Sequence, residues 1–231
     1  MGRESMRPLP AVIDVEIRTR DVVLEGMLAL PDTPSGLVVF AHGSGSSRFS
    51  RRNRDVAEAM QAAGLGTLLF DLLSAEENTR DRVTAEHRFD IALLARRLTD
   101  TVDWLGQEAA TRALRIGLFG ASTGAAAALI TAAERLQRVD AVVSRGGRPD
   151  LAGDALGRVR APTLLIVGGW DPEVIALNAQ AARQLTCAHR TAIVPDATHL
   201  FEEPGKLEQV SRLAAAWFAT YLAATDSRGA R

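Results

Sequence analysis

The chain has a single cysteine, no long apolar run and no excess of either charge. Because Cys187 stands alone, no disulfide can form within the chain, which fits a reducing compartment. No stretch approaches the roughly 18 uninterrupted apolar residues of a membrane-spanning helix. With 27 Lys and Arg against 28 Asp and Glu, the formal net charge is -1. We therefore expect neither nucleic acid nor an anionic membrane as a partner.

The sequence also lacks targeting and linker signals. Its first residues, Met1 to Ser5, contain none of the apolar segment of a signal peptide, so a cytoplasmic protein is expected. No internal repeat, low-complexity stretch or Pro/Gly/Ser linker divides the 231 residues. We predict a flexible N-terminus over residues 1–10, one domain over 11–225 and a flexible tail over 226–231.

The apolar residues change their pattern along the chain. Near the N-terminus, Ile13, Val15 and Ile17 alternate with charged residues, and a similar alternation runs from Leu24 to Leu30, which predicts an antiparallel hairpin. Short, mainly apolar runs follow, as is typical of strands buried on both faces. These runs cover residues 37–41, 67–70, 114–119, 141–143, 163–167 and 192–194.

Segments with helical spacing lie between these runs, for example Ile91, Leu94 and Leu98. Strand and helix therefore alternate after the hairpin, and parallel strands need long right-handed crossovers. The pattern predicts an α/β fold with about eight strands, a mostly parallel sheet, an antiparallel N-terminal hairpin and helices on both faces.

Ligands of such sheets bind beyond the carboxyl ends of the strands, where one serine occupies a characteristic motif. The residues from Gly120 to Gly124 read Gly-Ala-Ser-Thr-Gly, between the apolar run 114–119 and an alanine-rich segment. This is the form G-x-S-x-G at a strand-to-helix turn, where small residues permit a sharp turn that exposes the serine. Ser122 is the predicted nucleophile.

A carboxylate and a histidine follow the next strands in the order that this motif requires. Asp171 follows the run 163–167, and His199 lies behind the last run. A serine hydroxyl needs a base, and the base needs a carboxylate to orient it. Asp171 could instead cap a helix that begins at Pro172. Asp196 is a competing carboxylate, but it lies on the same loop as His199.

The loop after residues 37–41 is rich in glycine and serine and supplies a candidate oxyanion hole. We assign its two donors to the N–H groups of Ser44 and Thr123, the residue after the nucleophile. A phosphate-binding loop is disfavoured because the G-x-x-x-x-G-K frame is absent. His42 is interpreted as a structural histidine that supports this loop.

Together, the motifs A-H-G-S-G, G-A-S-T-G, G-G-W-D and A-T-H-L-F resemble the α/β-hydrolase superfamily, in particular its small, lidless dienelactone hydrolase-like branch. The similarity spans about residues 11 to 222. It implies an α/β-hydrolase fold without a cap domain and hydrolysis through an acyl-enzyme, with no metal and no organic cofactor. Dienelactone hydrolases proper carry a cysteine nucleophile, whereas this chain has Ser122. A general carboxylesterase is therefore the expected activity, and Cys187 is interpreted as structural.

The expected substrate is a small-molecule ester, anionic esters included, and candidate pocket residues follow the strands. Arg145, Trp170 and Phe201 are the candidates for substrate binding, with Phe49 as a further wall. Arg145 and Arg148 could each hold a carboxylate or phosphate through the guanidinium, whereas Arg80 and Arg82 fit better as solvated charges. The same triad would also serve a thioesterase, an amidase or a lactone hydrolase. A non-catalytic ligand-binding homologue is the alternative from another class.

Overall fold

A computed structural model describes residues 9–223 of the chain. The predicted flexible segments fall mostly on residues 1–8 and 224–231, outside the described residues. The strands are β1 (Val12–Arg18), β2 (Val23–Ala29), β3 (Leu37–Ala41), β4 (Gly66–Phe70), β5 (Ile116–Ala121), β6 (Val139–Arg145), β7 (Thr163–Gly168) and β8 (His189–Val194). The α-helices are α1 (Arg51–Ala62), α2 (Ala75–Thr84), α3 (Ile91–Leu105), α4 (Thr123–Glu134), α5 (Pro172–Ala182) and α6 (Lys206–Leu222), and η1 (Pro149–Arg158) is a 3₁₀ helix.

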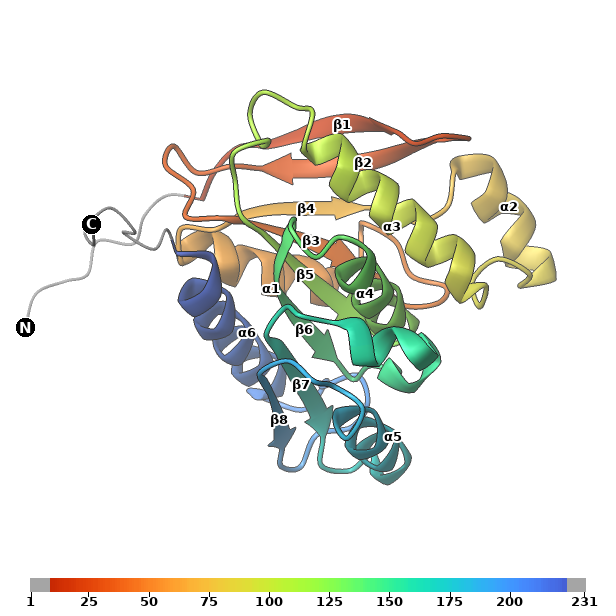
Figure 1. Ribbon diagram of the computed structural model, residues 1–231, viewed down its shortest axis with the longest axis vertical. Helices are drawn as coiled ribbons and strands as arrows, with labels where there is room; N and C mark the ends of the chain where they lie inside the picture. The colour runs from red at the N-terminus through yellow and green to blue at the C-terminus, as the bar shows by residue number, and fades with distance from the viewer. Residues whose placement is uncertain (1–8, 224–231) are drawn as a thin grey trace, which may run out of the picture.

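All eight strands form one sheet in the order β1-β2-β4-β3-β5-β6-β7-β8 (Figure 1). β1 pairs with β2 and β2 with β4 in antiparallel fashion, whereas the remaining pairs are parallel. The predicted hairpin and the mostly parallel sheet of about eight strands are therefore confirmed. The central strands are buried on both faces, which explains why their sequences show no polar alternation.

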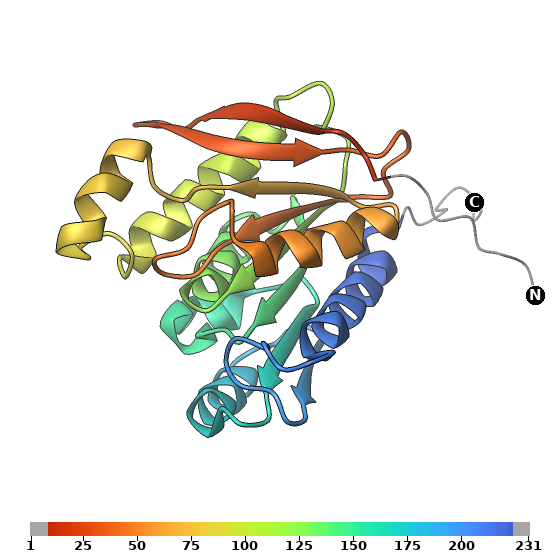
Figure 2. The ribbon, with the colours of Figure 1, turned by 180° about the vertical axis from the view of Figure 1, so that it is seen from behind.

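Helices cover both faces of the sheet, and each face has its own apolar core. α1 and α6 pack side by side on one face, where Phe40, Phe119 and Phe218 are fully buried (Figure 2). α3, α4, η1 and α5 cover the other face (Figure 1). No helix among residues 9–223 is long and apolar enough to cross a membrane.

The segment after β4 contains a helix that the apolar pattern does not indicate. Helix α2 occupies most of the segment between β4 and α3. Its N-terminus carries a capping box in which Ser74 Oγ accepts from Glu77 N (3.2 Å) and Glu77 Oε2 accepts from Ser74 N (2.8 Å). Because polar capping replaces an apolar face as the helix signal here, hydrophobic periodicity alone misses α2.

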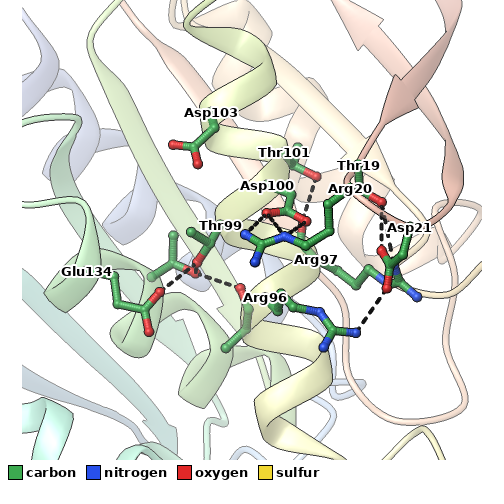
Figure 3. Close-up of polar contacts among 12 residues, drawn as sticks. Thr19, Arg20, Asp21, Arg96, Arg97, Thr99, Asp100, Thr101, Asp103 and Glu134 are labelled. Atoms are coloured by element: carbon green, nitrogen blue, oxygen red, sulfur yellow. Dashed lines mark hydrogen bonds and ion pairs between the residues drawn. The ribbon is translucent and has the colours of Figure 1, made fainter.

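Ion pairs, each with one buried partner, link the β1–β2 hairpin to α3. Arg97 is only 1 % exposed and pairs with Asp21 of the β1–β2 turn and, at 2.6 Å, with Glu77 of α2. Arg20 of the same turn meets Asp100 of α3 at 2.5 Å (Figure 3). A buried guanidinium is tolerated when carboxylates compensate its charge. Asp21 and Glu77 provide this compensation for Arg97.

Candidate active site

Ser122 lies on the sharp turn between β5 and α4, as the motif predicts. Its backbone has φ 50° and ψ −121°, a combination that residues other than glycine rarely adopt. Neighbouring backbone groups hold this conformation, because Ser122 N donates to Arg145 O (3.3 Å) and Ser122 O accepts from Arg148 N (3.0 Å). The residue is thus presented at the carboxyl end of the sheet, ahead of the first turn of α4.

The two glycines of the motif are required by close packing around this turn. A Cβ atom on Gly124 would lie 2.2 Å from the carbonyl oxygen of Ala41, and one on Gly120 would lie 2.4 Å from Cα of Ala125. Both distances are far below van der Waals contact. The small residues therefore let α4 approach β3 and β5 closely, which places Ser122 beside the loop that follows β3.

Asp171 and His199, 28 residues apart in the chain, form a hydrogen bond. His199 Nδ1 lies 2.7 Å from Asp171 Oδ2, and the side chains are 38 % and 16 % exposed. Asp171 is the residue before α5, yet its side chain makes no capping hydrogen bond to that helix. The carboxylate thus contacts the histidine instead of capping α5.

The competing carboxylate, Asp196, points elsewhere. Its side chain is 68 % exposed and lies 3.8 Å from the ammonium of Lys206. Among the hydrogen bonds of residues 9–223, none joins Asp196 to His199, whereas the bond from Asp171 is short. The geometry therefore favours Asp171 as the partner of the imidazole.

The end of β6 and the residue after it connect His199 to the turn of Ser122. A Cβ atom on Gly146 would lie 3.6 Å from Cε1 of His199, and Gly146 directly follows Arg145, whose carbonyl accepts from Ser122 N. No hydrogen bond between the Ser122 hydroxyl and the imidazole occurs within the described part of the chain. Catalytic hydrogen bonds are often long in ligand-free enzymes and shorten when substrate binds.

The loop after β3 contacts the turn of Ser122 directly. A Cβ atom on Gly43 would lie 3.0 Å from Cβ of Ser122. Ser44 N donates to Thr123 Oγ1 (3.1 Å), and the two hydroxyl oxygens are 2.9 Å apart. The predicted oxyanion donors are therefore adjacent, and the N–H of Ser44 is directed at the Thr123 hydroxyl. Thr123 begins α4, and the first N–H groups of a helix have no acceptor within the helix.

His42 supports the loop after β3 through hydrogen bonds of both ring nitrogens. Its Nε2 accepts from Leu72 N (3.1 Å), and Nδ1 lies 3.0 Å from Gly43 O. These partners require the neutral ring with its proton on Nδ1. Burial lowers the pKa of His42 below its usual range, although the Gly43 hydrogen bond and the charge of Asp71 oppose the shift. A structural role for this histidine agrees with these contacts.

The lowered pKa of His42 makes stability depend on pH. The unfolded chain takes up this proton below about pH 6.5, whereas the folded protein resists it, so the contribution of His42 is present above about pH 6.5 and is lost as the pH falls toward the folded-state pKa. Urea unfolding at pH 5, 6, 7 and 8 measures the effect. The His42→Gln variant is expected to lose less stability between pH 7 and 5, by up to about 1.4 kcal/mol per pH unit.

The exposed His189 supplies the control for this experiment. His189→Gln should retain the wild-type dependence of unfolding free energy on pH. If His42→Gln shows the wild-type dependence as well, His42 does not carry the pH effect.

The remaining predicted pocket residues have different environments. Trp170 is 59 % exposed, while Phe201 is buried and has a positive φ of 57°. Arg148 forms an ion pair with Asp150 at 2.8 Å, so its guanidinium already has a carboxylate. Arg145 is 8 % exposed and has no such partner within the described residues.

Two cavities flank the loop that follows β3, and Ser46, Ser47 and Phe49 line both. One, of about 570 Å³, lies toward α2, and the other, of about 630 Å³, lies toward the loop that follows His199. Ser122 and His199 line neither. Ser46 and Ser47 of this loop were not predicted as pocket residues, although they follow a buried strand, which is the signal that could have identified them.

The described residues contain no cluster of three or more His, Cys, Asp or Glu fit to hold a metal ion.

Residues 24–223 match the model of the dienelactone hydrolase family. The chain belongs to this family. It is also similar to the crystal structure of a dienelactone hydrolase from Anabaena variabilis, with a TM-score of 0.92 and 55 % identity over 93 % of this chain and 99 % of that one. An esterase domain from Rhodothermus marinus shares the fold, with a TM-score of 0.73 and 21 % identity over 92 % of this chain and all of that one. The family match supports a hydrolase, the esterase domain shows the fold alone, and the predicted resemblance is confirmed.

Two curated relatives from strains of Mycobacterium tuberculosis carry the name "Putative phosphoribosyl transferase". Each is 54 % identical to this chain over 216 residues, which is 94 % of this chain and 48 % of the relative. The chain thus spans about half the length of the curated relatives it matches.

Proposed function

We propose that this member of the dienelactone hydrolase family cleaves carboxylic esters through an acyl-enzyme on Ser122. The observation that carries the proposal is the 2.7 Å bond from Asp171 to His199 beside the strained turn of the serine. A serine at a strand-to-helix turn, a histidine and a carboxylate in this chain order make up the catalytic constellation of many hydrolases.

In the proposed reaction, His199 Nε2 takes the proton of the Ser122 hydroxyl while Oγ attacks the ester carbonyl carbon. The tetrahedral intermediate collapses as the bond to the alkoxide breaks, and the imidazolium protonates this leaving group. Water, deprotonated by the same imidazole, then attacks the acyl carbon; the bond from this carbon to Ser122 Oγ breaks, the imidazolium returns the proton to Oγ, and the acid is released. Asp171 keeps the proton on Nδ1 and stabilises the imidazolium, because its carboxylate accepts from that nitrogen.

The oxyanion of the intermediate would accept from Thr123 N, at the positive end of α4, and from Ser44 N. In the structure Ser44 N donates to Thr123 Oγ1. Binding of the substrate oxygen therefore exchanges one acceptor of Ser44 N for another. The Ser44 hydroxyl, which donates to Arg88 O (2.9 Å), holds the loop while this exchange occurs.

Other acyl substrates would react through the same intermediate, so thioesters, amides and lactones form the second group of candidates. The mycobacterial relatives are named for a transferase activity. Each of them is about twice as long as the segment that matches this chain. We propose hydrolysis because the family match extends over residues 24–223 and thus includes Ser122, Asp171 and His199.

Labelling with a fluorophosphonate probe tests the nucleophile without knowledge of the natural substrate. The wild-type protein is expected to take up one label, found by mass spectrometry on the peptide that contains Ser122, and Ser122→Ala should take up none. A matched control is Ser144→Ala, because Ser144 is a buried serine on the neighbouring strand β6. It should label as the wild type does. No label on the wild-type protein, or a label on another serine, would favour the non-catalytic ligand-binding alternative.

A further inference from the structure

His199 lies on a strained loop between β8 and α6. Asp196 and Phe201, on either side of the histidine, have positive φ values of 53° and 57°, which are uncommon for residues other than glycine. The side chain of Phe201 is buried in the core, so its backbone keeps this conformation while the ring is fixed. Strained backbone persists only where its surroundings hold it. The groups that hold this loop therefore decide where the imidazole lies.

The carboxylate of Glu203 holds the residue before the histidine. Thr198 N donates to both of its oxygens, and each N···O distance is 3.1 Å. Hydrogen bonding with Thr198 lowers the pKa of Glu203 below its usual range, although desolvation opposes the shift. Glu203 is therefore an anion at neutral pH. An N–H group binds a charged acceptor more strongly than a neutral one, so this contact is suited to fix the backbone of the loop.

Glu203 is itself joined to a rigid element. Its carbonyl oxygen accepts from Lys206 N (3.0 Å) at the start of α6. This helix packs on the sheet through fully buried side chains, among them Val210 and Phe218. The contact between Thr198 and Glu203 therefore ties the loop of His199 to a helix whose position is set by the core.

A second contact ties the same loop to the segment of Asp171. Trp170 N donates to Ala197 O (2.9 Å), and Trp170 directly precedes Asp171. Ala197 and Thr198, the two residues before His199, are thus held by different parts of the fold. The 2.7 Å bond between His199 and Asp171 requires that the loop keep its place relative to both.

We infer that Glu203 is a positioning residue, whose carboxylate holds the loop so that His199 Nδ1 faces Asp171 and Nε2 is left for the serine. Its contact is with the backbone of Thr198, one residue from the imidazole. A displacement of about 1 Å at a catalytic group can slow a reaction about 100-fold. The effect on turnover rests on the proposed ester hydrolysis, whereas the effect on the bond between His199 and Asp171 does not.

Kinetics with p-nitrophenyl butyrate test the effect on turnover. Glu203→Ala should lower kcat about 10-fold and change KM less than about twofold, because the imidazole is displaced while the substrate contacts remain. Glu203→Gln keeps an acceptor oxygen for Thr198 N and should recover most of the loss. The matched control is Glu202→Ala, because the Glu202 carboxylate pairs with Arg52 at 2.7 Å and accepts from neither Thr198 nor His199 within residues 9–223. It should retain the wild-type kcat. A wild-type kcat in Glu203→Ala, or an equal loss in Glu202→Ala, would overturn the inference.

Proton NMR tests the positioning without any substrate. The wild type should show a strongly downfield resonance for the proton on His199 Nδ1, because this proton lies in a short hydrogen bond to a carboxylate, and Asp171→Asn should lack it. Glu203→Ala should lose or broaden the resonance, while Glu203→Gln and Glu202→Ala should keep it. Upfield methyl resonances in the same spectra show that each variant is folded. An unchanged downfield resonance in Glu203→Ala would overturn the inference, whereas its loss in a protein whose wild type hydrolyses no ester would overturn only the proposed function.

Discussion

Replacement of Ser122 by alanine is expected to lower kcat for p-nitrophenyl acetate and butyrate by a factor on the order of 10⁴–10⁶. Without the hydroxyl no acyl-enzyme can form, and only the oxyanion donors and substrate binding remain. The strained turn itself should persist, because its backbone hydrogen bonds to Arg145 and Arg148 do not involve the side chain. Release of p-nitrophenol by the purified variant, beside the wild type, measures the effect.

Two further variants make this result specific. Ser144→Ala should retain wild-type kcat, because the Ser144 hydroxyl has no hydrogen-bond partner within residues 9–223. A double variant that lacks both Ser122 and His199 should be no slower than Ser122→Ala, since residues that act as one unit are not additive. Equal activity of wild type and Ser122→Ala would exclude Ser122 as the nucleophile.

Asp171→Asn should lower kcat for the same esters by about 10⁴ near pH 7. The amide occupies the same volume but can donate to His199 Nδ1, which shifts the ring proton to Nε2 and leaves no base for the serine. The 2.7 Å bond between Asp171 and His199 supports this expectation. Initial rates should be measured with protein whose circular dichroism matches that of the wild type.

Asp196→Asn is the matched control, because it makes the same change on the loop of His199. Asp196 is largely exposed and is paired only loosely with Lys206, so kcat should change less than about threefold. A large loss in Asp196→Asn together with a small one in Asp171→Asn would reverse the assignment of the orienting carboxylate.

Local patterns of the sequence predict much of the fold. The alternation from Ile13 to Ile17 predicts a strand with one solvent-exposed face, and the mainly apolar runs predict strands covered by helices on both faces. Both patterns are local, because they depend only on the spacing of side chains a few residues apart and on whether each side chain is exposed to solvent. The helix α2 is missed because its N-terminus is stabilised by the Ser74–Glu77 capping box and not by an apolar face.

Chain order and strand ends likewise make Ser122, Asp171 and His199 candidates from sequence alone, because a parallel sheet brings the carboxyl ends of its strands to one edge. Only the tertiary structure distinguishes Asp171 from a helix cap and from Asp196, since a side-chain hydrogen bond depends on where two distant loops meet. The acceptor of Ser44 N is decided in the same way. The sequence also places Arg145 at a strand end, but only packing shows that none of residues 9–223 supplies a carboxylate to it, because its one side-chain contact comes from Asn53, which is remote in the chain.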